Sequence, residues 1–420
     1  MTCPYRIRTV RFGTGERLPM LVRRSDGLPL FMPTVYSTTM LRQRNLASNT
    51  IRQALRSLMV LYLLADERGY DVEARIRDGE FLSLGDITAL VTAVSSRIDE
   101  SDVSKDDVGT VVKPATAASR LRYIRDYLSW LCSWRQYQLS CETDRYLAYD
   151  RGRAEMIGAL EARIANPKGR NSVNRREGFS AEAALRIAEL VDPESRNNPW
   201  EDKTVRVRNF LIIMWLMGLG IRRGELLGVM VPDIDNRRQT VLIARRPDNP
   251  DDPRRDEPNT KTRDRVLALD EDLLAATLDY VINVRGPIVK RTHARHKFLF
   301  IDHQRGRALS SAAISKMFVE LTAELRKLRV DFPEIPERVS AHVLRHAWND
   351  RLSEESDRVG MSPEDEKRIR NESMGWSQTS NTAADYLRRT IRRQAAKADL
   401  NIQKGIFSGN KSDRERESLE

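Results

Sequence analysis

The sequence predicts a mainly α protein with two domains: a helical N-terminal domain, and a second domain in which helices accompany a small antiparallel sheet. Apolar residues recur at helical spacing through most of the chain, whereas only the segments 240–244 and 265–269 have clear strand character. The length of 420 residues also exceeds the usual size of a single hydrophobic core. A chain of this kind is therefore expected to fold as more than one unit.

The N-terminal domain is expected at residues 37–165, preceded by a basic arm at 1–36. Its first helix begins near Ser48 and ends at Gly69, since Gly is the residue that most readily closes a helix. The apolar face of this helix is formed by Ile51, Leu55, Leu58, Met59 and Tyr62. A second helix is expected at 84–94, followed by a polar connection at 101–109.

A third helix, expected at 115–137, has two possible interpretations. Besides an apolar face it carries aromatic residues and, near its start, arginines: Tyr123, Tyr127, Trp130 and Trp134, and Arg120, Arg122 and Arg125. The arginines could neutralise DNA phosphates while the aromatic rings pack on sugars. Alternatively, the aromatic stripe is core packing and the charged face is simply solvated.

The boundary between the domains is expected at a linker covering 166–178, because Asn-Pro-Lys-Gly-Arg-Asn-Ser at 166–172 is basic and rich in turn-forming residues. A helical stretch of mixed charge, 150–164, precedes it. The second domain is expected at 179–400, with a C-terminal tail at 401–420.

The second domain opens with a helix that Ser180 can cap, followed by an apolar helix at 204–219 and another beginning near Arg223. The two expected strands are separated by a loop that cannot form a regular ladder, because it contains Pro247, Pro250, Pro253 and Pro258. Helices are expected to dominate from Ser311 onward.

Composition narrows the classes of function. The formal charge of +11 and the pI of about 9.6 favour a polyanionic partner. Three scattered cysteines suit a reduced, cytoplasmic protein and form no zinc-ligand pattern. The most apolar run, 210–221, is shorter than the ~20 residues that cross a bilayer, so we expect a buried helix and no membrane partner.

An ordered set of short motifs points to chemistry. They are Gly220-Ile221-Arg222-Arg223-Gly224-Glu225-Leu226-Leu227, Thr260-Lys261-Thr262, His342-Val343-Leu344-Arg345-His346, Gly375-Trp376 and Ala384-Asp385-Tyr386-Leu387. Each motif alone is weak, since an arginine is usually a surface charge and a tyrosine usually packs. The spacing of His342 and Arg345 is more informative, because residues three apart share one helical face.

Together these motifs resemble the catalytic set of the tyrosine recombinase, or phage integrase, family. The family's motifs begin with an Arg that is followed three residues later by Glu-Leu. After it come, in this order, a Lys in a β-hairpin turn, a His-x-x-Arg, a Gly-His or Gly-Trp, and a nucleophilic Tyr. The resemblance covers 179–393 well and 37–165 more loosely. It implies a catalytic domain of helices with a small sheet and a helical core-binding domain that contacts DNA.

The resemblance also assigns roles in site-specific recombination through a covalent 3′-phosphotyrosyl intermediate. Tyr386 would attack the phosphorus, His342 would take its proton, and Lys261 would protonate the departing 5′ oxygen. Arg222 and Arg345 would meet the charge that develops on the non-bridging oxygens. Trp376 completes the catalytic set, as a donor of one hydrogen bond that also packs around the site. Glu225 and His346 would support these residues, and Arg223, Arg388 and Arg389 would contact DNA.

Lys261 depends on an unusually long loop, and Lys203 and Lys290 are weaker alternatives. One residue more than usual separates Trp376 from Tyr386, which the turn before Tyr386 must absorb. Neither a metal nor another cofactor is expected, because a phosphotyrosyl bond keeps the energy of the broken phosphodiester. The acidic pair Asp233 and Asp235 is more typical of a turn than of a metal site.

The implied partner is double-stranded DNA carrying recombination sites, bound by a homo-oligomer that we expect to be a tetramer, with room for accessory DNA-bending proteins. The arginines after Tyr386 could hold the phosphate backbone or form a solvated helix face. Three related activities remain open: a type IB topoisomerase, a telomere resolvase, and a non-catalytic DNA-binding protein on the same scaffold. We expect action in the cytoplasm, in a bacterium, phage or mobile element.

Overall fold

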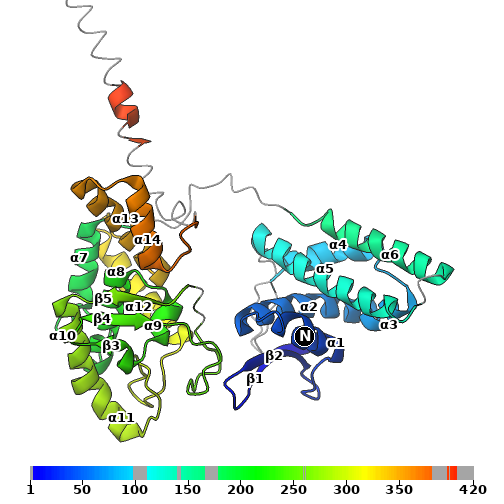
Figure 1. The fold of residues 1–420 in the computed structure, drawn as a ribbon, viewed down its shortest axis with the longest axis horizontal. Coiled ribbons are helices and arrows are strands. Elements are labelled where there is room, and N and C mark those ends of the chain that lie inside the picture. The colour runs from blue at the N-terminus through cyan, green and yellow to red at the C-terminus, as the bar shows by residue number, and fades with distance from the viewer. Residues whose placement is uncertain are drawn as a thin grey trace, which may run out of the picture. The chain divides into compact units, whose positions relative to one another are not determined.

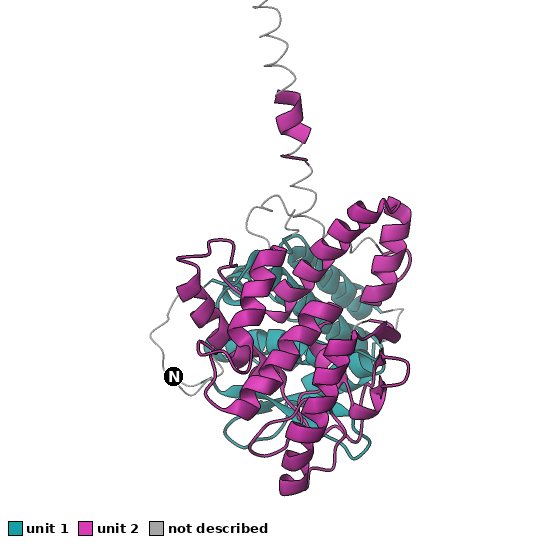
Figure 2. Cartoon of the chain, turned by 90° about the vertical axis from the view of Figure 1, so that its left-hand side faces the viewer, with its two compact units in different colours: residues 1–172 teal, residues 173–420 magenta. Residues whose placement is uncertain are grey.

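The computed structural model describes residues 3–97, 111–139, 143–165, 178–258, 260, 262–380, 395–396 and 398–403. It is mainly helical, with one two-stranded and one three-stranded antiparallel sheet in these segments. The chain divides into two compact units, Met1–Ser172 and Val173–Glu420, which are coloured separately in Figure 2. The division falls within the segment 166–178, most of which lies outside the described residues.

The first unit is built around the helix α2 (Ser48–Arg68), which the sequence predicted and which Gly69 closes in a left-handed conformation. The helices α4 (Leu84–Ser95) and α5 (Pro114–Gln136) pack against it, as Figure 1 shows. The remaining helical segments of this unit are α1 (Phe31–Tyr36), η1 (Ser37–Arg42), α3 (Val72–Asp78) and α6 (Asp144–Glu161). Their apolar faces form one core.

The N-terminal residues differ from the expected basic arm. Strands β1 (Tyr5–Arg11) and β2 (Arg17–Arg23) form an antiparallel hairpin that packs on α2. The reason is visible in the burial of side chains: Tyr5 and Leu21 enter the core, whereas Arg6 and Arg8 stay exposed. The arginines thus lie on a folded hairpin rather than on a separate arm.

The second unit places a small sheet among helices (Figure 1). Its strands β3 (Ile234–Asp235), β4 (Thr240–Ile243) and β5 (Arg265–Ala268) are antiparallel, and β4 and β5 correspond to the two predicted strands. The apolar helix α8 (Lys203–Leu219) is buried in the core, as expected for the run 210–221. None of the helices in the described segments is long and apolar enough to cross a bilayer.

The other helical segments of this unit surround α8 and the sheet. They are α7 (Ala181–Val191), α9 (Arg223–Gly228), η2 (Val231–Asp233), α10 (Glu271–Asp279), η3 (Tyr280–Arg285), α11 (Gly286–Thr292), α12 (Ser311–Leu328), α13 (Ala341–Val359) and α14 (Pro363–Met374). The helical run from 271 to 292 is a feature that the sequence analysis did not predict. Ser180 caps α7 as expected, its hydroxyl accepting from the Ala183 N–H at 3.2 Å.

Candidate active site

The turn between α8 and α9 presents Arg222. The helix α8 ends at Gly220, whose φ of 60° is left-handed, and a Cβ there would lie 2.7 Å from the Trp348 ring. Glycine is therefore required at this position on two counts. Arg222 is the N-cap residue of α9, directly before its first residue Arg223, and its N–H donates to Glu225 Oε2 at 2.9 Å, which closes the first turn of the helix.

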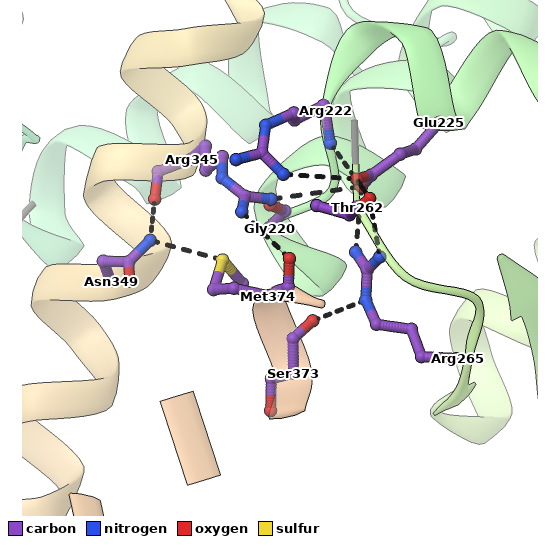
Figure 3. A network of polar contacts seen from close by, with 9 residues as sticks. All are labelled: Gly220, Arg222, Glu225, Thr262, Arg265, Arg345, Asn349, Ser373 and Met374. Carbon is purple, nitrogen blue, oxygen red and sulfur yellow. Dashed lines mark hydrogen bonds and ion pairs between the residues drawn. The ribbon is translucent and has the colours of Figure 1, made fainter. Parts of the chain in front are cut away.

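The helix α13 carries the predicted His-x-x-Arg motif. Arg345 is fully buried, and its Nη1 donates to the Gly220 carbonyl at 2.6 Å while its Nη2 donates to the Met374 carbonyl at 3.3 Å. One side chain thus joins the end of α8 to the end of α14 (Figure 3). Asn349, one turn later, donates its amide to the Arg345 carbonyl at 2.8 Å.

Both arginines are paired with a single buried carboxylate, Glu225. Arg222 Nη1 lies 3.4 Å from Glu225 Oε1, and Arg345 Nη1 lies 4.0 Å from Oε2. Two further residues contact the same carboxylate: Arg265 Nη2 at 2.8 Å from Oε2, and the Thr262 hydroxyl, which donates to Oε1. Glu225 is 1% exposed, so these contacts replace its hydration.

These contacts decide the charge of Glu225. Burial, the largest influence, would raise its pKa, but the attraction of Arg265 and then of Arg345, with hydrogen bonds from Arg265 and Thr262, lowers the pKa from 4.5 to about 2. Glu225 is consequently ionised at neutral pH. An ionised carboxylate between guanidiniums can fix their orientation.

Trp376 lies next to this cluster. It follows Gly375, whose left-handed φ of 67° ends α14, and it packs with Met374 and Trp348. The Arg345 guanidinium lies 5.4 Å from the centroid of the Trp376 ring, within the range of a cation–π contact. Trp376 therefore packs against one of the two predicted catalytic arginines.

The predicted histidines share one face of α13. His342 is exposed and His346 is 5% exposed, and their rings meet edge to face with centroids 4.7 Å apart. The ring of His342 thus contacts a buried histidine, and a supporting role for His346 stays a prediction. An exposed imidazole in this position remains accessible to a substrate.

The structure brings four of the predicted residues into one cluster: Arg222, Glu225, Arg345 and Trp376. Four others, Lys261, Tyr386, Arg388 and Arg389, lie outside the described residues. The catalytic roles of all of them remain predictions. Within the described segments, no group of three or more His, Cys, Asp or Glu side chains is arranged to hold a metal ion.

The predicted DNA-contacting arginines occupy different environments. Arg120 Nη1 donates to the carbonyls of Val94 and Ser96 at 2.9 and 2.7 Å, which ties α5 to the end of α4. Arg125 forms ion pairs with Asp126 and Glu161. Both guanidiniums thus have partners within the first unit.

Arg223 is exposed on α9 and donates to Ser315 Oγ at 2.9 Å. The aromatic stripe of α5 is packing along most of its length: Tyr127 is fully buried, and Trp130 stacks between Tyr127 and Trp134 with centroid distances of 5.9 Å. Trp134, 42% exposed, is its outer end.

Two residues of the cluster, Arg265 and Thr262, were not among the predicted site residues. The strand pattern offered a signal for Arg265, because alternation along the predicted strand 265–269 places it on the same face as Leu267 and Leu269. That face packs against the core, so Arg265 must be buried, and a buried arginine needs a partner.

Comparison with known proteins agrees with the motifs. The model of the phage integrase family matches residues 181–392, half of the chain. A candidate integrase/recombinase, y4rF, of Sinorhizobium fredii (strain NBRC 101917 / NGR234) is 30% identical over 144 residues, which is 34% of this chain. The matched region spans only 28% of that relative.

Solved structures with a similar arrangement include the integrase of transposon Tn1549 in complex with circular intermediate DNA, at 15% identity and a TM-score of 0.49, covering 85% of this chain and 95% of the other. The XerH site-specific recombinase bound to palindromic difH substrate is 15% identical, with a TM-score of 0.41 and coverage of 75% and 84%. The match of the family model over half of the chain, which includes every motif identified in the sequence, shows that the chain belongs to the phage integrase family.

Proposed function

We propose that the chain is a site-specific DNA recombinase that breaks and rejoins duplex DNA through a covalent 3′-phosphotyrosyl intermediate. One observation carries this proposal: Arg222 and Arg345, 123 positions apart along the chain, are held at the same buried carboxylate. Two guanidiniums fixed at one place suit a phosphate whose oxygens gain charge during the reaction. Family membership supports the same class of reaction.

In the proposed reaction the Tyr386 oxygen attacks the scissile phosphorus and forms the phosphotyrosyl bond, while the bond from phosphorus to the 5′ oxygen breaks. His342 takes the phenol proton, and Lys261 gives a proton to the departing 5′ oxygen. Rejoining reverses these transfers with the 5′ end of the exchanged strand. No nucleotide hydrolysis is required, because the phosphotyrosyl bond is similar in energy to the bond that it replaced.

The described residues contribute orientation and charge. Arg222 is 28% exposed at its side chain and can reach a bound phosphate, whereas Arg345 is buried and fixed by two carbonyls. Trp376 has a single donor, its indole N–H, and cannot shuttle protons. Its contribution is packing against Arg345 and a hydrogen bond rather than acid–base chemistry.

The proposed partner is double-stranded DNA carrying recombination sites, on which protomers assemble as a tetramer, with or without accessory DNA-bending proteins, in the cytoplasm. The surplus of basic residues in the chain fits such a partner. The target sequence would be read by base contacts, which phosphate-binding arginines do not supply.

The test is formation of a covalent protein–DNA complex on nicked suicide duplexes carrying the repeats that flank the gene. We expect the wild type to form the complex and Tyr386→Phe to lose it, because phenylalanine lacks the attacking oxygen. Tyr137→Phe is the matched control, since Tyr137 is 94% exposed and outside the proposed site. A complex that persists in Tyr386→Phe would show that another residue is the nucleophile.

Product analysis on the same preparation separates the related activities. Relaxation of supercoiled plasmid without any specific site would indicate a topoisomerase, and hairpin-ended products would indicate a telomere resolvase. A wild type that binds the duplexes and never forms the covalent complex would leave only a DNA-binding protein.

A further inference from the structure

Arg265 makes a set of contacts that the proposed reaction does not yet use. It begins β5 and is 6% exposed. Its Nη2 lies 2.8 Å from Glu225 Oε2, its Nε donates to the Ser373 carbonyl at 2.7 Å, and its Nη1 lies 3.4 Å from Thr262 Oγ1 (Figure 3). A single guanidinium thus connects β5 with α9 and with the end of α14.

The first consequence concerns Glu225. The charged groups that face this carboxylate are Arg222 on its own helix, Arg345 from α13 and Arg265 from β5, and the Thr262 hydroxyl adds a neutral donor. Arg265 makes the shortest of the three arginine contacts. Because three guanidiniums surround one carboxylate, the cluster keeps a surplus of positive charge for a phosphate.

The second consequence concerns the end of α14. Consecutive carbonyls in its last turn each accept from one arginine: Ser373 from Arg265 and Met374 from Arg345. Cations are favoured at this end of a helix, where the backbone carbonyls lack helical partners. The segment before β5 adds a further contact, since the Arg263 N–H donates to the Gly375 carbonyl at 3.1 Å.

The packing around Gly375 is close enough to depend on Arg265. A Cβ at Gly375 would lie 2.8 Å from Arg265 Nη1 and 2.9 Å from Thr262 Cβ. The guanidinium therefore lies directly against the turn that positions Trp376. Any movement of Arg265 would be transmitted to Trp376 and, through Glu225, to Arg222 and Arg345.

We propose that Arg265 is a positioning residue for strand cleavage: it fixes Glu225 against Arg222 and Arg345 and fixes the end of α14 that carries Trp376. This inference rests on the proposed recombinase function. Arg265 acts through other residues, since its described contacts are to Glu225, Thr262 and Ser373. It is distinct from the residues assigned to the scissile phosphate.

The pH dependence of an Arg265 variant distinguishes positioning from a general structural role. Burial raises the pKa of Glu225, and Arg265 is the strongest of the groups that lower it. Without Arg265 the pKa of Glu225 therefore rises, and Glu225 becomes protonated as the pH falls. Protonated Glu225 loses its hold on Arg222 and Arg345, so cleavage declines toward lower pH.

The experiment uses the full-length chain and the nicked suicide duplex, with single-turnover rates of covalent-complex formation measured from pH 6 to 9. We expect Arg265→Met to lower the rate at pH 8 by roughly 10- to 100-fold, in keeping with the cost of small misplacements in an active site. The affinity for the duplex should change by less than about twofold, because Arg265 is buried. The rate of this variant should fall further toward pH 6 than that of the wild type.

Three other variants complete the test. Arg265→Lys keeps a positive charge beside Glu225 but cannot bond Glu225, Thr262 and Ser373 together, so we expect a smaller loss and the pH profile of the wild type. The double variant Arg265→Met/Glu225→Gln should lose the additional pH dependence. Arg358→Met is the matched control, because Arg358 forms an exposed ion pair with Glu355, and its rate should equal that of the wild type.

The outcomes are separable. If the wild type cleaves and Arg265→Met keeps its rate or its pH profile, the positioning role is wrong while the proposed function stands. Equal losses of cleavage and of DNA binding in Arg265→Met would also overturn the positioning role. So would an Arg265→Lys variant that cleaves as fast as the wild type. The Arg265→Lys result remains a test of the role even if Arg265→Met fails to fold. A wild type that binds the duplex without forming a covalent complex would overturn the proposed function, and with it the positioning role.

Discussion

Arg222 and Arg345 share a carboxylate but differ in what else holds them. The Arg345 guanidinium is bound by two carbonyls and is fully buried, whereas that of Arg222 is partly exposed. An exchange of arginine for lysine would leave a charge at either site but remove the planar pair of donors. We therefore expect the two arginine-to-lysine exchanges to differ in their effect on the free energy of unfolding and to have similar effects on the rate of cleavage.

Arg345→Lys should reduce the rate of covalent-complex formation by roughly 10²–10³-fold, because an ammonium cannot supply two fixed donors to the developing charge. Its affinity for the duplex should stay within about twofold, since the proposed role of Arg345 is confined to the transition state. Single-turnover cleavage and gel-shift titrations on one preparation measure both quantities. Parallel losses of cleavage and affinity would contradict the role.

Glu225→Gln should destabilise the second unit at neutral pH. The folded-state pKa of about 2 lies below the ordinary value of 4.5, so the ionised carboxylate stabilises the fold above about pH 4.5 and this contribution disappears as the pH falls toward 2. A shift of this size corresponds to roughly 3 kcal/mol. Urea unfolding of the wild type and of Glu225→Gln between pH 7 and pH 3 measures the free energy of unfolding of each. The difference between the two free energies should shrink as the pH falls.

Glu355→Gln is the control for that experiment, because Glu355 is an exposed carboxylate on α13 whose pKa its hydrogen bond with Arg358 also lowers. Its unfolding midpoint should match that of the wild type. If the free energies of unfolding of Glu225→Gln and the wild type differ by the same amount across the pH range, the ionisation of Glu225 is not the cause of the lost stability.

Among the elements, α5 shows how tertiary contacts redirect charged residues. Its arginines Arg120 and Arg125 are engaged by the end of α4 and by Asp126 and Glu161, whereas Arg122 makes no hydrogen bond or ion pair with the described residues. The helix thus serves the core through its apolar and aromatic faces. Of these three arginines, Arg122 is therefore the one that we expect to contact phosphate.

Arg122→Ala should weaken DNA binding and reduce the slope of log affinity against log salt by about 0.9, the value for one phosphate contact. Arg125→Ala should leave the slope unchanged, because its charge is already neutralised within the unit. Fluorescence anisotropy at several salt concentrations gives both slopes. A reduced slope for Arg125→Ala, or none for Arg122→Ala, would reverse this assignment.

The proline-rich segment between β4 and β5 is anchored by Arg254. This side chain is 8% exposed, pairs with Asp252 at 2.8 Å, and donates to the carbonyls of Leu227 and Leu309 at 2.9 and 3.1 Å. Its guanidinium also lies 4.1 Å from the centroid of the Phe298 ring. A segment without a regular ladder is thereby fixed to the end of α9.

Arg254→Leu should destabilise the protein by about 3–5 kcal/mol, because it removes a buried guanidinium that pairs with the buried Asp252 carboxylate and donates to two buried carbonyls. Arg255→Leu is the neighbouring control, since Arg255 is exposed, and its effect should stay within about 0.5 kcal/mol. Urea unfolding compares the two. Equal stability of both variants would mean that Arg254 does not anchor the segment.

For the whole molecule, the formal charge of +11 is divided between structural and available arginines. Arg265, Arg345 and Arg254 are buried and paired, so they contribute little to a sequence-independent attraction for DNA. We expect that attraction to come from exposed residues such as Arg6 and Arg8 on the hairpin. The net charge indicates the sign of the partner but does not locate the surface that binds it.

Affinity for duplex DNA should therefore fall steeply with salt, by about 10³–10⁵ between 50 and 200 mM if 6–10 phosphates are contacted. The cause is the loss of the entropy gained on counterion release. Titrations of one duplex over this range measure the slope. A change smaller than tenfold would show that phosphate contacts are few and that the basic surplus serves another purpose.

The sequence determined the features that depend on local patterns. The periodicity of apolar residues predicted α2, α4, α5, α7 and α8 to within a few residues, since a helix face is specified by neighbours three and four positions apart. The ordered motifs predicted the family, which the match over 181–392 confirmed. The hairpin at 5–23 and the helices at 271–292 were missed because their separate elements are short: the strands have seven residues each, and the helical run is divided into segments of nine, six and seven residues.

The tertiary structure decided which charged side chains are buried and what they contact. Arg265 lies forty positions after Glu225, and Arg345 lies 120 positions after it. No local pattern therefore predicts that both arginines contact the Glu225 carboxylate. The same holds for Arg120 and Arg125, whose sequence pattern suggested DNA contacts. The physical reason is that the charge and orientation of an ionisable group depend on burial and on nearby opposite charges, which exist only once distant segments have packed together.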